Sequence, residues 1–157
     1  WNRGWKTSVV IDDVVVTNSA VLTDATNLSF TTVANTQYTI RYTVYFATTS
    51  AAADFKYRLT HAGTTARVCR ETLSGEGDNL PTWKTPKSTF DLADVTLLDA
   101  AVATCNMIQE YMILQVGASG GVLKLQFAQN TQTAGNSATV FEGSYIDWTT
   151  TSAPAAK

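Results

Sequence analysis

Two stretches of this chain alternate between apolar and polar side chains with a period of two, and this pattern constrains the fold more than any other feature. The first is YTIRYTVYF, residues 38–46, and the second is VLKLQFAQ, residues 122–129. Successive side chains of a β-strand point to opposite faces of its sheet. We therefore expect two half-buried strands with these core-facing residues: Tyr38, Ile40, Tyr42, Val44, Phe46, Leu123, Leu125 and Phe127.

Further strand patterns run along the chain, each bounded by residues typical of turns. They bring the total to roughly eight short strands, which is typical of an all-β fold, an antiparallel two-sheet β-sandwich with jelly-roll connections. No internal repeat or second compositional zone is present, so we expect one domain. We divide the chain into an N-terminal arm with the first strand or strands (1–26), a jelly-roll domain (27–148) and a flexible tail (149–157). The additional predicted strands are 7–17, 27–33, 54–59, 66–73, 107–116 and 137–148.

Two connections carry specific expectations. The acidic pair Asp12 and Asp13 interrupts the run 7–17, so this run is either one charged edge strand or two short strands joined by a turn. The sequence GASGG, residues 117–121, predicts a tight hairpin between 107–116 and 122–129, with glycine supplying positive φ angles.

The middle of the chain is harder to interpret. Residues 74–91 contain proline and glycine and predict a long irregular loop, a kind of segment that often carries function. Residues 92–106 are rich in Leu and Ala, which suit a helix, but Thr and Val favour a strand there.

Composition excludes some classes of function. Of the 157 residues, 45% are hydrophobic and only 15% are charged, with a formal net charge of −2. Binding to the phosphate backbone of a nucleic acid requires a cationic stripe, and none is visible. The apolar runs are far shorter than the roughly 20 residues of a membrane span, so we expect no membrane partner.

Cys69 and Cys105 are the only cysteines. We expect two buried thiols that act as small hydrophobic groups, and the alternative is one disulfide between two strands. Two distant cysteines and one histidine lack the close spacing of a zinc site, so we expect no metal.

No motif for catalysis is present, and we expect no catalytic residue, no cofactor and no enzymatic activity. His61 lies in a predicted turn without an adjacent nucleophile or ligand set, which indicates a structural role. The acidic residues, Glu110 and Asp147 among them, are scattered and are interpreted as solvated groups on outer strand faces. The loop GEGDN, 75–79, lacks the complete ligand spacing of a calcium loop.

Aromatic and outward-facing residues are the candidates for partner binding. Trp1 and Trp5 suggest an N-terminal arm that docks on another surface. Trp83 lies in the proline-bounded loop, either as an anchor for a partner or a sugar, or as a lid folded onto the sandwich. Tyr45 and Gln126 occupy outward positions of the two clearest strands and are candidates for a subunit interface.

The segment GASGGVLKLQFAQNTQTAGNSATVFEGSYIDW, residues 117–148, resembles the C-terminal part of a group of tailed-bacteriophage virion proteins. In that group a glycine-rich turn precedes a strand like LxLQ(F/W)AQNT, a polar loop and a strand ending in GSY or GSW. Residues 27–66 are similar to the same group, although His61 replaces a frequent proline. The matching residues are Gly117, Gly120, Gly121, Leu123, Leu125, Gln126, Phe127, Ala128, Gln129, Asn130, Gly143, Ser144 and Tyr145.

This resemblance implies a jelly roll related in shape to the complement C1q and tumour necrosis factor modules. It further implies a homotrimer that is made in the host cytoplasm and functions in the virion, as a capsid decoration or cement protein, a head fibre or a tail-associated part. The expected partners are further copies of the chain and the major capsid protein or another virion protein. The alternatives are a tail-fibre module that binds a receptor or a host surface glycan, and a hydrolase acting on polysaccharide.

Overall fold

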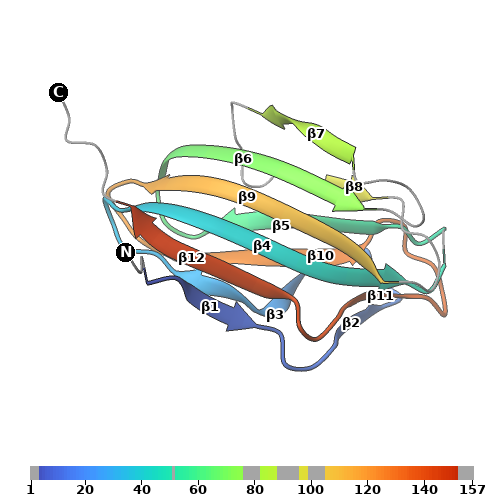
Figure 1. The fold of residues 1–157 in the computed structure, drawn as a ribbon. Helices are drawn as coiled ribbons and strands as arrows, with labels where there is room; N and C mark the ends of the chain where they lie inside the picture. Colours follow the sequence, from blue (N-terminus) through green and yellow to red (C-terminus); the bar gives the residue numbers. More distant parts are fainter. Residues whose placement is uncertain (1–3, 51, 76–81, 88–95, 99–104, 152–157) are drawn as a thin grey trace.

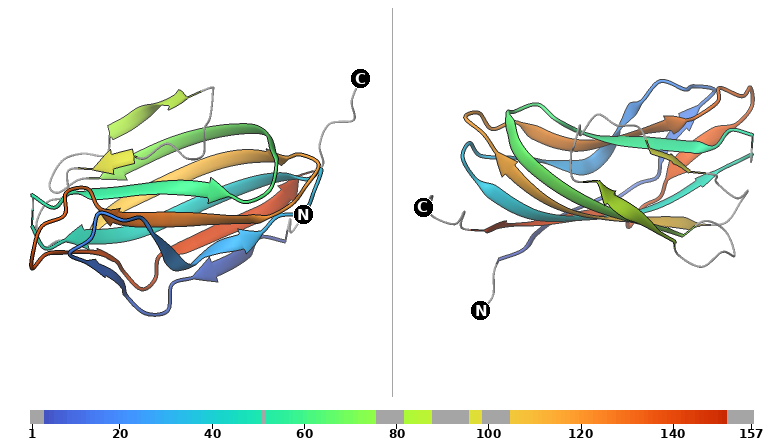
Figure 2. Two further views of the ribbon diagram at one scale, coloured as in Figure 1. Left: turned by 180° about the vertical axis from the view of Figure 1, so that it is seen from behind. Right: turned by 90° about the horizontal axis from the view of Figure 1, so that it is seen from above.

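The chain forms two antiparallel β-sheets that face each other as two layers (Figures 1 and 2). The computed structural model describes residues 4–50, 52–75, 82–87, 96–98 and 105–151, and these contain no helix. The predicted two-sheet antiparallel β-sandwich is thereby confirmed. The described strands are β1 (Lys6–Val9), β2 (Val14–Thr17), β3 (Thr23–Thr31), β4 (Gln37–Thr48), β5 (Phe55–His61), β6 (Thr65–Gly75), β7 (Thr82–Lys87), β8 (Thr96–Leu98), β9 (Asn106–Val116), β10 (Val122–Gln129), β11 (Ser137–Val140) and β12 (Tyr145–Thr151).

The larger sheet has the strand order β1-β12-β4-β9-β6-β7. Strand β11 also pairs with β4, beyond the end of β12, and β2 pairs with β11. The smaller sheet has the order β3-β10-β5-β8. Strands β4 and β9 therefore lie at the centre of the larger sheet, and β10 and β5 at the centre of the smaller one.

The core lies between the sheets and contains the residues that the alternation of apolar and polar side chains predicts to be buried. All eight core-facing residues predicted for 38–46 and 122–129 are buried. Aromatic rings from both sheets meet there: the ring centroid of Phe55 lies 4.2 Å from that of Phe46 and 5.7 Å from that of Phe127. Phe30 of β3 stacks on Trp148 of β12 at 4.4 Å. Burial of these side chains is the main source of stability in such a fold.

The predicted hairpin between 107–116 and 122–129 is wrong. Strand β9 lies in the larger sheet, whereas β10 pairs with β3 and β5 in the smaller one, so residues 117–121 connect the two layers. The corner is tied to neighbouring loops: the amide of Thr32 donates to the carbonyl of Gly121 at 2.8 Å, and that of Thr64 to Ser119 at 2.9 Å. Alternation identifies the faces of a strand but not its partners.

The glycines of this corner are needed for close approach and not for positive φ, which among the described glycines occurs at Gly135 and Gly143. A Cβ atom on Gly121 would lie 2.3 Å from the amide nitrogen of Gly63. A Cβ atom on Gly120 would lie 2.3 Å from the carbonyl oxygen of Thr32. Side chains at these two positions would therefore separate the loops that close this end of the sandwich.

The prediction of an irregular loop throughout 74–91 also has to be corrected. Strand β7 forms within it and pairs with β6 as an edge strand of the larger sheet (Figure 1). Pro86 does not prevent this, because an edge strand leaves one row of its amides unpaired. Strand β8 forms within 92–106, in agreement with the strand interpretation at that point, and most of that segment lies outside the described residues.

Both ends of the described chain join the larger sheet. Asp12 and Asp13 lie between β1 and β2, so the turn, and not a continuous edge strand, is the correct alternative. The predicted strand 137–148 is divided into β11 and β12, with Gly143 at a φ of 80° in the connection. Thr149 and Thr151 continue β12 and pair with β4, although they fall in the segment expected as a flexible tail.

The expectation of buried or bridged cysteines is wrong as well. Cys69 and Cys105 are both free and exposed. Cys69 lies between the buried Val68 and Arg70 on β6, so alternation directs its thiol to the outer face of the larger sheet.

Candidate interaction surfaces

Exposed apolar side chains gather near the start of the described chain. Of the nine exposed large hydrophobic residues in the described part, five fall within residues 5–21. Ile11 is 71% exposed and Trp5 is 50% exposed. Single exposed hydrophobic residues scattered over a surface are normal, but several within one short segment are not. We call this set the N-terminal edge; its members are Trp5, Val9, Ile11, Val15 and Val21.

Strands β1 and β2 and their connection, which contain Val9, Ile11 and Val15, run along one side of the sandwich (Figure 1), and Trp5 precedes β1 while Val21 follows β2. A shallow hollow of about 310 Å³ lies beside the connection, lined by residues 10–15 and by Thr26 and Asn27 of β3. The side chain of Asp13 accepts a hydrogen bond from the amide of Glu142 at 2.8 Å, which holds the connection against the turn between β11 and β12. The apolar residues are therefore presented on an ordered part of the chain.

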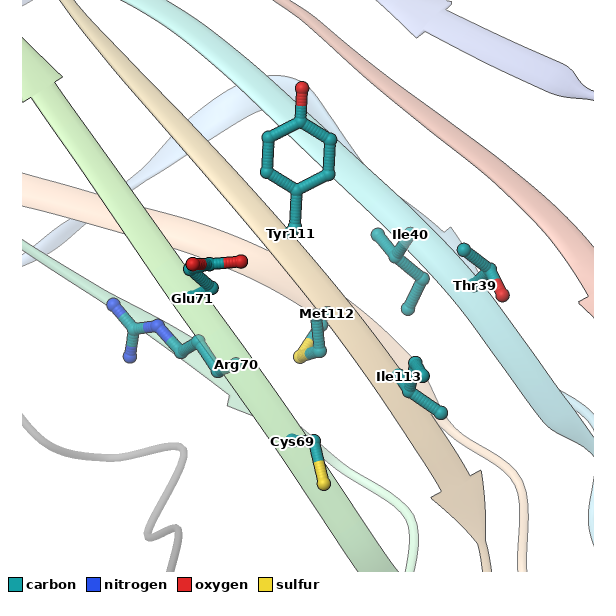
Figure 3. A pocket seen from close by; sticks show the side chains of 8 residues that line it. All are labelled: Thr39, Ile40, Cys69, Arg70, Glu71, Tyr111, Met112 and Ile113. Atoms are coloured by element: carbon teal, nitrogen blue, oxygen red, sulfur yellow. The ribbon is translucent and has the colours of Figure 1, made fainter. Parts of the chain in front are cut away.

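The second surface is the outer face of the larger sheet. Here Tyr111 and Ile113 of β9 are 40% and 46% exposed, between Thr39 of β4 and Cys69 and Glu71 of β6 (Figure 3). They line a shallow hollow of about 370 Å³. A second hollow of about 190 Å³ adjoins it, lined by Gln37, Arg67, Cys69, Ile113 and Gln115.

The charged groups near β12 on this face are already paired. The guanidinium of Arg41 donates a hydrogen bond to the carboxylate of Asp147, and it lies 5.6 Å from the ring centre of Tyr145. The hydroxyl of Thr7 donates to the other oxygen of Asp147 at 2.7 Å. The hydrogen bond with Asp147 raises the pKa of Arg41. Asp147 is thus mostly buried and paired, contrary to the expectation of a solvated acid.

The outer face of the smaller sheet carries a polar network. Asp24 accepts hydrogen bonds from Lys124 and from the side-chain amide of Gln126, each at 2.6 Å. Arg58 donates to the carbonyl oxygen of the same Gln126 amide at 2.8 Å. The hydrogen bonds from Lys124 and Gln126 lower the pKa of Asp24.

An ionic cluster lies inside the sandwich. Glu110 of β9 is fully buried and accepts two hydrogen bonds from Arg70 of β6, at 2.7 and 2.5 Å, and one from the hydroxyl of Tyr57 of β5. Burial opposes the charge on Arg70, but the hydrogen bonds and charge of Glu110 outweigh it and raise the pKa of Arg70. Burial, with the charge of Glu110, raises the pKa of Tyr57. The solvated interpretation of Glu110 is therefore wrong.

This cluster joins strands of the two sheets, because Arg70 lies on β6, Glu110 on β9 and Tyr57 on β5. Both oxygens of the Glu110 carboxylate accept hydrogen bonds from within the protein, so the carboxylate is already engaged as a hydrogen-bond acceptor. Within the described residues, no three His, Cys, Asp or Glu side chains gather as a metal site would require. The described part likewise contains no helix long and apolar enough to cross a membrane.

His61 lies at the corner that joins the sheets, hydrogen-bonded through both ring nitrogens. Its Nε2 lies 2.8 Å from the hydroxyl of Thr32, and its Nδ1 lies 3.0 Å from that of Thr65. Thr32 donates its own proton to the carbonyl of Gly121, so Nε2 is the donor and Nδ1 the acceptor. Partial burial lowers the pKa of His61. The neutral ring is part of the corner.

The structure brings few of the predicted partner-binding residues together. Trp5 lies on the N-terminal edge, while Trp1 and the side chain of Trp83 lie outside the described residues. Tyr45 points outward from the larger sheet and Gln126 from the smaller one, so the whole sandwich separates them. Sequence reasoning missed Ile113 and Tyr111. Both alternate along β9 with buried residues, so their outward orientation could have been predicted from the sequence.

Comparison with known proteins adds nothing to this geometry, because no protein-family model, no curated protein and no solved structure matches the chain.

Proposed function

We propose that this chain is a non-enzymatic structural protein of a tailed-phage virion. In this proposal it is a jelly-roll protein, made in the host cytoplasm, that forms a trimer and decorates or cements the capsid or forms a head fibre. The N-terminal edge is the single observation that carries the proposal. The N-terminal edge binds the major capsid protein or another virion protein.

The distribution of exposed apolar side chains supports attachment through the N-terminal edge. Exposure of five large hydrophobic residues within residues 5–21 is costly in water unless a partner covers them. Elsewhere the described surface also carries polar networks, such as the one around Asp24. Cohesion that rests on burial and strand pairing, with few ions, also persists when the salt concentration changes.

The proposal is tested with capsids that lack this protein, incubated with the purified chain and sedimented. We expect Ile11→Asp and Val15→Asp each to reduce co-sedimentation by about tenfold or more, because each places a charge in a buried contact. Val33→Asp is the matched control: Val33 is 63% exposed and precedes the start of β4, whereas Val15 pairs with Thr139, which pairs with Ala47 near the end of β4. Equal effects of all three substitutions, or a wild-type chain that does not bind, would contradict the proposed attachment.

The expected trimer is tested separately by sedimentation equilibrium of the purified chain. A mass of three copies, or of six where trimers also pair, supports the assembly that the family resemblance implies, and a chain that stays monomeric or dimeric at high concentration opposes it.

A further inference from the structure

Three adjacent rows of outward residues on the larger sheet cross β6, β9, β4 and β12, and a further uncharged row with Gln109, Thr43 and Tyr145 lies beyond them. The central row is uncharged and has Ile113 at its middle. One flanking row contains Arg67 as its charged residue, and the other contains Glu71 together with the paired Arg41 and Asp147. In strand order the rows are Arg67, Gln115, Gln37 and Thr151; then Cys69, Ile113, Thr39 and Thr149; then Glu71, Tyr111, Arg41 and Asp147.

We propose that a second copy of this chain binds this face, with the two outer faces packed against each other about a twofold axis that runs along the central row. The inference goes beyond the proposed function, because a twofold contact between larger sheets is a different interface from a threefold assembly or a capsid contact.

The charge pattern selects this axis. A twofold axis in the interface and perpendicular to the strands exchanges the two flanking rows, while each strand lies over its own counterpart. Arg67 of each copy then faces Glu71 of the other, which gives two equivalent ion pairs. The charges of Arg41 and Asp147 cancel within one copy and do not disturb this balance.

The other simple twofold arrangement satisfies fewer charges. An axis parallel to β9 would place β6 of one copy over β4 of the other. Arg67 would then face Gln37 and gain no acid, and Glu71 would face Arg41, which Asp147 already binds. Charge complementarity of this kind determines orientation more than affinity.

The shape of the face agrees with the same axis. Tyr111 stands in the flanking row of Glu71, and the smaller hollow lies around Arg67, Gln115 and Gln37 in the opposite row. Exchange of the rows brings the exposed ring of Tyr111 in each copy onto this hollow in the other. Ile113 of one copy contacts Ile113 of the other at the centre of the interface, from which water is excluded. Aromatic and aliphatic side chains in such central positions supply most of the energy of an interface.

Charge reversal tests the inference by sedimentation velocity over a range of concentrations. Arg67→Glu and Glu71→Arg each bring like charges together twice, so each should weaken twofold association by about tenfold or more. The double variant R67E/E71R restores opposite charges and should recover most of the wild-type association. Lys56→Glu, a reversal on strand β5 of the smaller sheet, is the matched control and should change nothing.

Cys69 provides a second measurement, because the axis passes through its row and places it close to Cys69 of the other copy. In a Cys105→Ser background, a short reagent that joins two thiols should link two copies in high yield, and R67E should reduce that yield. The inference is overturned if the wild-type chain shows no twofold association or if the double variant R67E/E71R fails to restore that association. It is also overturned if R67E leaves the yield of thiol cross-linking unchanged. None of these outcomes depends on whether the trimer or the capsid contact exists.

Discussion

The hydroxyl of Tyr57 in the smaller sheet donates a hydrogen bond to the carboxylate of Glu110 in the larger sheet, across the core of the sandwich. Nearby, the hydroxyl of Tyr42 is fully buried and has no hydrogen-bond partner among the described groups. Two tyrosines in one core thus differ in whether the buried hydroxyl is satisfied.

This difference predicts opposite responses to the same substitution. Tyr57→Phe should lower the free energy of unfolding by about 1.5–3 kcal/mol, because hydrogen bonds to a charged group are stronger than average. Tyr42→Phe should be neutral or stabilising, since it removes a hydroxyl that buried surroundings leave unsatisfied. Urea unfolding followed by tryptophan fluorescence measures both. A larger loss for Tyr42→Phe than for Tyr57→Phe would contradict the assignment.

Removal of the buried carboxylate should cost more than replacement of the whole pair. Glu110→Leu eliminates the acceptor of two hydrogen bonds from Arg70 and should destabilise the protein by about 3 kcal/mol or more. The double variant R70M/E110L replaces both charges with apolar groups of similar length and should lose less than the single variant. A double-mutant cycle from urea unfolding gives the coupling energy. Additive losses would show that the two side chains do not act as a pair.

Close packing of the corner predicts a strong effect of a single methyl group. Gly121→Ala should destabilise the protein by about 1–3 kcal/mol, because its Cβ would collide with the backbone of residues 62–63. Gly4→Ala is the control, since no atom lies within 4 Å of the position its Cβ would take. The melting temperature of each variant measures the difference, and equal values would refute the packing argument.

The lowered pKa of His61 predicts a dependence of stability on pH. Because burial lowers the pKa in the folded state below its usual 6.5, the unfolded chain binds a proton first as the pH falls. The contribution of His61 to stability is therefore complete above about pH 6.5 and decreases as the pH falls below that value. Melting temperatures between about pH 7.5 and 5 should show this decrease for the wild type and a weaker one for His61→Gln. Asp24 acts in a separate range, because its pKa is lowered from 3.8.

The sequence by itself determined which side chains enter the core and that the fold is an all-β sandwich. Alternation is a local property of a strand, so the inward faces of β4, β5 and β10 could be read directly. The position of Glu110, two residues from both Ile108 and Met112, also indicated a charged residue facing the core, although Glu110 was interpreted as a solvated group.

Only the tertiary structure decided which strands pair and which outward residues lie together. The period of two is identical for a hairpin and for a strand that crosses to the other sheet, so the corner at 117–121 could be assigned wrongly. Arg67, Ile113 and Thr39 belong to three separate segments, and the register of the hydrogen bonds places them on one face. Pairing is set by non-local packing of the whole core, and the interaction surfaces follow from that pairing.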